Sequence, residues 1–178
     1  MTSTLARDWW LPALCGLFSA AYAVTNLIGQ SEDGSLGVRE FLGHGTVVLL
    51  GQFALVAGLA SIGAGIVRRS WLLALNGAAL IGYAWIHFFW SRGSLRFAPV
   101  AVLFVVMAIS VGIVEVAAPG PHRWILKLPG IACLGYALGF VLLGLQWIRL
   151  EPVWFLVWIS SYFAFSALSM LVLAGRAV

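Results

Sequence analysis

The sequence predicts an all-α membrane protein: a single integral membrane domain over residues 1–178, with six transmembrane helices built as three parallel helix-hairpin repeats. Three observations lead to this fold class. Of the 178 residues, 62% are hydrophobic and 9% are charged, whereas about a quarter of the residues in soluble domains are charged. Six segments are long and apolar enough to cross a bilayer. A fixed frame of residues recurs in every second segment.

The six predicted spans are separated by short polar segments. They cover residues 9–29, 41–66, 71–91, 98–118, 124–146 and 153–174. A helix needs roughly 20 mainly apolar residues to cross the hydrocarbon core. The strands of membrane β-barrels are short and alternate in polarity, whereas these segments are continuous. Pro152 suits the first turn of the last helix, where its missing N–H is not needed.

Lysine and arginine set the expected orientation of the spans. When the N-terminus is placed inside, the inner side carries Arg7, Arg68, Arg69, Arg123, Lys127 and Arg176, and the outer side carries Arg39, Arg92, Arg96 and Arg149. Because basic residues favour the cytoplasmic side, the sequence predicts that both termini are cytoplasmic. Tryptophans would mark the interfaces, with Trp9, Trp10, Trp71 and Trp124 on the inner side and Trp85, Trp90, Trp147, Trp154 and Trp158 on the outer side.

Composition and motifs also exclude some classes of function. The net charge of +4 is scattered between apolar segments, and no basic run is longer than the pair Arg68 and Arg69, so we expect no nucleic-acid partner. Cys15 and Cys133 fall within spans and form no CxxC pair, so we expect them to be buried as small apolar side chains. There is no nucleophile–base pair, phosphate-binding loop or HExxH motif. We therefore predict no catalytic residue, no cofactor and no metal.

One frame of residues, W-x3-L-x-G-x5-Y-A, recurs in the three odd-numbered spans and contains three of the four tyrosines. Its residues are Trp10, Leu14, Gly16, Tyr22 and Ala23; Trp71, Leu75, Gly77, Tyr83 and Ala84; and Trp124, Leu128, Gly130, Tyr136 and Ala137. An odd span and the following even span therefore form the repeat unit, with units at about 9–66, 70–118 and 123–174. Each unit crosses the membrane twice, so the repeats are parallel and a pseudo-threefold arrangement is the simplest geometry.

The glycine and alanine of the frame lie on nearly the same side of the helix, because they are seven residues apart. Such a seam of small residues allows two helices to approach closely. In the even spans, Gly58, Gly112 and Ala167 occupy comparable places. These seams could join helices within one chain, or two copies in a homo-oligomer.

The repeated tyrosines Tyr22, Tyr83 and Tyr136 would lie at one depth inside the bilayer. A buried tyrosine hydroxyl needs a hydrogen-bond partner. Two arrangements meet this need. The three hydroxyls could form a polar ring around a central pocket, or each could bond a neighbouring backbone carbonyl and tie its own hairpin together.

Glu115 is the one acidic residue well inside a predicted span, and Lys127 follows it across a turn. Carboxylates within the membrane are costly and are candidates for functional sites. Both side chains would lie near the inner interface, so a salt bridge across the hairpin is one interpretation. A proton or cation site is the second, and a side chain that reaches toward the interface is the third.

His44 and Glu40 lie four residues apart at the start of the second span, and His87 lies near the outer end of the third. At the outer face, histidine can change charge between about pH 5 and 7, so pH sensing is one hypothesis. Ordinary interfacial histidines are the alternative. These three residues do not supply enough closely spaced ligands to predict a metal site.

Several segments resemble the HdeD family of bacterial acid-resistance membrane proteins. They are DWWLPALCGLFSAAYAV, RRSWLLALNGAALIGYAW and the closing SYFAFSALSMLVLAGRAV. The resemblance implies six spans, short repeated helix pairs with Trp-led odd helices, and a place in the bacterial inner membrane. It also implies a stress-associated role without established catalysis, and it supplies no catalytic residues.

The expected function is therefore that of a non-enzymatic, multi-pass inner-membrane protein with a role in envelope or acid-stress tolerance. One alternative is a small transporter or channel that passes a proton or small solute along the repeat axis. Another is an intramembrane enzyme that acts on an apolar or lipid substrate. Membrane lipids are the expected partners in each case.

Overall fold

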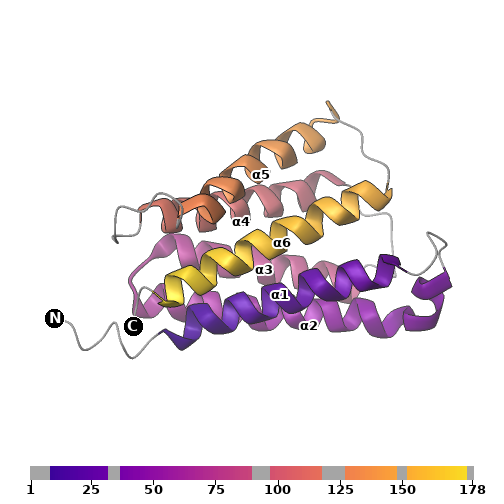
Figure 1. Ribbon diagram of the computed structural model, residues 1–178, viewed down its shortest axis with the longest axis horizontal. Coiled ribbons are helices and arrows are strands. Elements are labelled where there is room, and N and C mark those ends of the chain that lie inside the picture. Colours follow the sequence, from indigo (N-terminus) through magenta and orange to yellow (C-terminus); the bar gives the residue numbers. More distant parts are fainter. Residues whose placement is uncertain (1–8, 32–36, 90–96, 118–126, 148–151, 176–178) are drawn as a thin grey trace.

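The computed structural model describes residues 9–31, 37–89, 97–117, 127–147 and 152–175. Within these ranges, side chains are described except those of 27–31, 37–47, 87, 89, 97–99, 152–153 and 155–156. The described residues form six helices (Figure 1): α1 (Trp10–Ser31), α2 (Gly37–Val67), α3 (Trp71–Phe89), α4 (Phe97–Ala117), α5 (Leu128–Gly144) and α6 (Pro152–Gly175). The predicted all-α fold class is confirmed for this part of the chain.

Within the described ranges, three helices are long and apolar enough to cross a membrane. The qualifying segments are Val48–Val67 in α2, Val100–Ala117 in α4 and Val157–Gly175 in α6. Two further apolar helical stretches, Trp71–Ile86 and Leu128–Gly144, are shorter. By length and composition, these helices indicate a membrane protein.

Prolines decide where some of the helices begin. Pro152 is the first residue of α6, as expected, and Pro129 lies at the start of α5. Helix α5 begins at Leu128, later than the predicted start at Trp124, which lies outside the described residues. Proline inside a helix lacks a donor and its ring clashes with the preceding turn. Pro129 is compatible with the first turn of α5, and a helix extended back to residue 124 would have placed it further inside.

Two helices end in the same backbone motif. Ser70 N–H donates to the carbonyl of Gly65 at 2.8 Å after α2, and Trp147 N–H donates to that of Leu142 at 3.0 Å after α5. The residue before each donor, Arg69 or Gln146, has a positive φ of 52° or 59°. This is the Schellman motif, which usually has glycine at the left-handed position.

Small residues bring the helices together in pairs. A Cβ atom added to Gly58 of α2 would lie 2.9 Å from the carbonyl oxygen of Gly77 in α3. Likewise, a Cβ atom added to Gly112 of α4 would lie 2.8 Å from the carbonyl oxygen of Gly130 in α5. Any side chain larger than glycine would push these backbones apart. The predicted seams therefore join helices within the chain.

The third close contact joins the two ends of the chain. A Cβ atom added to Gly16 of α1 would lie 3.0 Å from the carbonyl oxygen of Ala167 in α6. Figure 1 shows α6 running beside α1, although they are the first and last helices of the chain. The three contacts thus use the small residues that the sequence aligns, and each pairs an even helix with the next odd one in cyclic order.

Aromatic rings fill the centre of the bundle. The ring centroids of Phe104 and Phe140 are 4.6 Å apart, and those of Tyr22 and Phe163 are 4.1 Å apart. Tyr162 packs edge-on against both Phe104 and Phe140. Tyr83 packs on Phe104 and Phe163, so side chains from five helices, α1, α3, α4, α5 and α6, meet in this cluster.

Of the seven tryptophans whose side chains the structure describes, six are exposed and one is half-buried. Trp9, Trp10, Trp71, Trp85, Trp147 and Trp154 are exposed. Trp158 instead turns inward and packs on Tyr136, with its ring over Gly139. Gly139 of α5 leaves room for this ring between the two helices, and the membership of Trp158 in an outer belt stays a prediction. Trp90 and Trp124 lie outside the described residues.

Candidate functional site

Glu115 is fully buried near the C-terminal end of α4. It lies against Gly130 of α5, where an added Cβ atom would be 3.0 Å from both the Cβ and the Oε2 of Glu115. Gly130 is also the glycine of the repeated frame, so the close approach of α4 and α5 makes the space that the carboxyl group occupies. Burying a carboxylate in an apolar bundle is costly, which marks Glu115 as the first candidate for a functional residue.

Lys127 reaches across the connection between α4 and α5. Its Nζ donates to the backbone carbonyl of Val116 at 2.8 Å. The structure thus brings Lys127 to the turn of α4 that carries Glu115. The acceptor of this hydrogen bond is the carbonyl of Val116, the residue after Glu115. The salt bridge between Lys127 and the Glu115 carboxylate stays a prediction.

The residue at the place of Glu115 differs among the three tight contacts. Counting three positions on from Gly58, Gly112 and Ala167 leads to Ser61, Glu115 and Met170, and all three are buried. In the first contact, the Ser61 hydroxyl donates to the Leu73 carbonyl at 2.8 Å and accepts from Asn76 Nδ2 at 3.0 Å. Similar helix contacts are therefore built with a hydroxyl, a carboxyl or a thioether at this place.

The repeated tyrosines follow neither expected arrangement completely. The hydroxyls of Tyr22 and Tyr83 bond each other at 2.8 Å and so join α1 to α3. Tyr136 donates to Ser161 Oγ at 2.6 Å, which ties α5 to α6 through a side chain rather than a carbonyl. Two tyrosines thus form a central pair, the third stays within its own hairpin, and Phe163 packs against the pair.

A further polar contact joins α1 to α6. Asn26 Nδ2 donates to Ser160 Oγ at 2.7 Å, and Ser160 is fully buried. This bond links the two helices that also meet at Gly16 and Ala167. Hydrogen bonds of this kind between membrane helices contribute modestly, about 1 kcal/mol each.

The histidine hypothesis concerns side chains outside the described residues. The backbone of Glu40 and His44 lies in α2, and that of His87 lies in α3. Their proposed pH response therefore stays a prediction. Among the side chains that are described, no group of three or more His, Cys, Asp or Glu could hold a metal ion.

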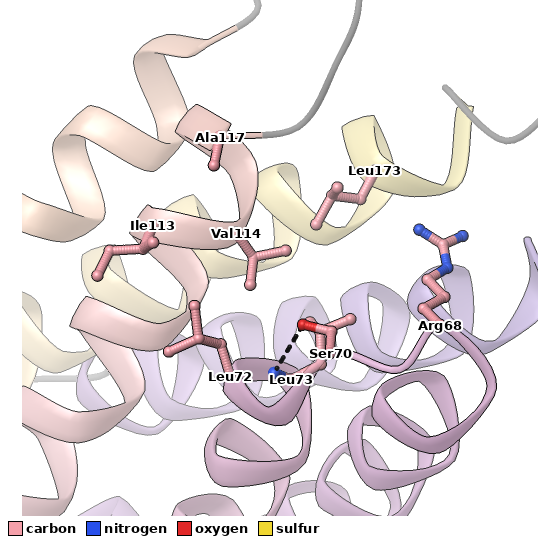
Figure 2. Close-up of a pocket in the computed structure, with 8 residues that line it drawn as sticks. All are labelled: Arg68, Ser70, Leu72, Leu73, Ile113, Val114, Ala117 and Leu173. Carbon is pink, nitrogen blue, oxygen red and sulfur yellow. Dashed lines mark hydrogen bonds between the residues drawn. The ribbon is translucent and has the colours of Figure 1, made fainter.

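A groove lies between the C-terminal ends of α4 and α6 on one side and the α2–α3 turn on the other (Figure 2). It has a volume of about 280 Å³ and is lined by Arg68, Ser70, Leu72, Leu73, Ile113, Val114, Ala117 and Leu173. The sequence marks Arg68 only as an orientation signal. What it cannot show is that the turn after α2 sets this arginine beside apolar residues of two distant helices.

A second groove, of about 450 Å³, lies on α2 and α3 and is lined by Leu55, Ile81, Ala84, Trp85 and Phe88. Its lining is almost entirely apolar, as expected for a surface that faces acyl chains. It carries no charged residue that would select one ligand.

Comparison with protein-family models, curated proteins and solved structures finds no match to this chain. The function is therefore argued from the residues and their arrangement.

Proposed function

We propose that this chain is a six-span protein of the bacterial inner membrane, similar to HdeD, which contributes to envelope or acid-stress tolerance without catalysing a reaction. Its spans would form three parallel helix-hairpin repeats with both termini in the cytoplasm. The observation that carries the architecture is the recurrence of one small-residue contact at Gly58–Gly77, Gly112–Gly130 and Ala167–Gly16. Three contacts in one register are what a repeat of helix pairs requires.

The packing at the centre of the bundle supports the proposal over the transporter alternative. Phe104, Phe140 and Phe163 pack together there, and the hydroxyls of Tyr22 and Tyr83 bond each other. A filled centre favours a protein that acts as a packed membrane element over one that passes a solute along its axis. The resemblance of the Trp-led helices to HdeD supports the link to acid stress.

Cysteine labelling tests the six-span topology. The two native cysteines, Cys15 and Cys133, are buried and should not react with a membrane-impermeant maleimide. Ser35→Cys and Ser94→Cys should be labelled from outside intact cells, whereas Ser3→Cys and His122→Cys should be labelled only after the cells are opened. Labelling of Ser3→Cys or His122→Cys in intact cells would contradict the orientation.

Acid survival tests the proposed role. A strain without the gene should survive exposure to low pH less well than the parent, and the wild-type gene should restore survival. Restoration by the double variant His44→Gln, His87→Gln should be lost, because glutamine cannot gain the charge that histidine gains in acid. If the deletion strain survives as well as the parent, the stress role is wrong. If the double variant also restores survival fully, the histidine mechanism is wrong but the stress role stands.

One observation favours a second candidate, proton-coupled transport. Glu115 is fully buried in a place where the corresponding contacts use Ser61 and Met170, so the packing does not demand a carboxyl group there. Proton flux into proteoliposomes should then fall in Glu115→Gln and remain in Ser61→Ala, which alters the matching place. Flux that persists in Glu115→Gln would remove Glu115 from this role.

A further inference from the structure

The hairpin of α5 and α6 is packed more loosely than the tight pairs of helices. Helix α6 packs mainly on α1 and only lightly on α5. Where α5 and α6 meet, the ring of Trp158 lies directly over Gly139, in the space that a Cβ atom would occupy. We propose that Trp158 is a releasable wedge, whose ring moves between this inserted position and the membrane interface and so sets the separation of α5 and α6.

The wedge lies between two firmly packed pairs of helices. Helix α5 packs on α4 through Gly130, and an added Cβ at Gly144 would also lie 3.1 Å from the Cβ of Ala101 in α4. Helix α6 packs on α1 through the contact of Ala167 with Gly16. A movement of the Trp158 ring therefore changes the spacing between these two pairs and leaves the packing within each pair in place.

The inserted position leaves the indole N–H without a hydrogen bond. Trp158 Nε1 is shielded from solvent and has no acceptor among the residues that the structure describes. A shielded N–H without an acceptor is costly in apolar surroundings, and tryptophan favours the interface, where its N–H is hydrated. Contacts of the ring thus hold Trp158 between the helices, and its single polar group favours release.

Helix α6 gives the ring a second position within reach. Trp158 lies six residues after Pro152, the first residue of α6, so its Cα is about 9 Å from that end of the helix. Side chains on a helix lean toward its N-terminus. Trp154 lies one turn earlier on the same face of α6 and is exposed. A rotation of the side chain would therefore bring the Trp158 ring beside Trp154.

Tyr136 of α5 holds the wedge in its inserted position. The ring centroids of Tyr136 and Trp158 are 4.9 Å apart. The Tyr136 hydroxyl donates to Ser161 Oγ at 2.6 Å, and Ser161 Oγ donates in turn to the Trp158 carbonyl at 2.8 Å. Loss of the Tyr136 hydroxyl should therefore favour release. The inference rests on the proposed place of the chain in a membrane, but not on its role in acid stress.

The test is ¹⁹F NMR of the full-length protein in phospholipid nanodiscs, after labelling with 5-fluorotryptophan. Trp158→Phe and Trp154→Phe assign the two resonances by their loss. A water-soluble gadolinium chelate should broaden the resonance of Trp154, which is exposed, and not that of an inserted ring. We expect two resonances for Trp158 in the wild type: a sheltered main one, and a minor one of about 1–10% that the chelate broadens.

Matched glycine variants examine the space that the wedge occupies. In Gly139→Ala the added Cβ takes the place of the ring, so the broadened resonance of Trp158 should become the main one. Gly135→Ala makes the same change one turn earlier on α5, where an added Cβ meets nothing within 4 Å, and should retain the wild-type ratio. Tyr136→Phe keeps the aromatic ring and should raise the minor resonance about two- to tenfold, as expected for the loss of one hydrogen bond.

Two results would overturn the proposal. A single sheltered Trp158 resonance in both the wild type and Tyr136→Phe would make the ring a fixed part of the core. Equal ratios in Gly139→Ala and Gly135→Ala would show that the ring does not depend on the space at Gly139. If Gly139→Ala does not fold, the comparison of the wild type with Tyr136→Phe decides. Failure of these tests would leave the acid-survival and labelling experiments unaffected.

Discussion

The contact between α2 and α3 and that between α4 and α5 share a backbone arrangement but differ in polarity. In each, two glycines face each other, and a Cβ atom added to the glycine of the even helix would lie 2.9 Å or 2.8 Å from the carbonyl oxygen of its partner. Ser61 and Asn76 then close a small network on the Leu73 carbonyl in the first contact. In the second, Glu115 occupies the place of Ser61. The comparison teaches that the glycines build the contact and that the polar residue beside them is free to differ.

The largest expected effect comes from the glycines themselves. A Cβ atom at Gly77 would lie 2.5 Å from the Gly58 carbonyl oxygen, which is backbone and cannot move aside easily. Gly77→Ala should therefore destabilise the protein by about 3 kcal/mol and lower its melting temperature in detergent. Gly135→Ala is the control, because an added Cβ there meets nothing within 4 Å. Equal melting temperatures for both variants would show that the tight contact does not limit stability.

The network in the α2–α3 contact should give the next largest effect. Ser61→Ala removes the donor to the Leu73 carbonyl and the acceptor for Asn76, all of which lie in a buried contact. We expect a loss of about 1–2 kcal/mol, measured as a shift in thermal or denaturant unfolding. The double variant Ser61→Ala, Asn76→Ala should be no less stable than Ser61→Ala. In the single variant the buried Asn76 amide loses its acceptor, and the second substitution removes that amide. A clear further loss in the double variant would contradict this pairing.

A substitution at the end of α5 should have a smaller effect and should stabilise the protein. Gln146 has a φ of 59°, a conformation that costs a side chain about 1 kcal/mol and costs glycine almost nothing. Gln146→Gly should therefore stabilise the protein by up to about 1 kcal/mol, seen as a higher melting temperature. Gly144→Ala, two positions earlier in α5, has Ala101 at 3.1 Å from the added Cβ and should not stabilise it. A decrease in stability for Gln146→Gly would contradict the Schellman motif as the end of α5.

The smallest expected effect sharpens the comparison most. Glu115→Ser places the Ser61 side chain in the second contact, removing a buried carboxyl group but also some packing. Because these two changes oppose each other, stability should change by less than about 1 kcal/mol. A large loss in thermal stability would show that the carboxyl group is part of the scaffold. Unchanged stability together with lost proton flux would assign Glu115 a role outside the packing.

Much of this arrangement follows from local sequence, but local sequence does not identify which helices and side chains contact each other. Apolar segments and polar connections predicted the ends of the six helices to within four residues, with the largest differences at the start of α2 and at the start of α5, where Pro129 lies in the first turn. The small-residue frame predicted close helix contacts without identifying which helices meet. The tyrosine frame placed Tyr22, Tyr83 and Tyr136 in equivalent positions, yet the structure pairs the first two and turns the third to Ser161. Trp158 went inward because Gly139, on another helix, leaves space for its ring.

The sequence by itself determined the class of protein, the extents of most helices and the residues able to form close contacts, because length, apolarity, proline and glycine act within one helix. Only the tertiary structure decided that α6 returns to α1, that Glu115 lies against Gly130 and that Arg68 lines an apolar groove. The physical reason is that leucine facing lipid and leucine facing another helix are in equally apolar surroundings. Hydrophobic periodicity therefore cannot distinguish the two faces, and close packing across distant parts of the chain makes the choice.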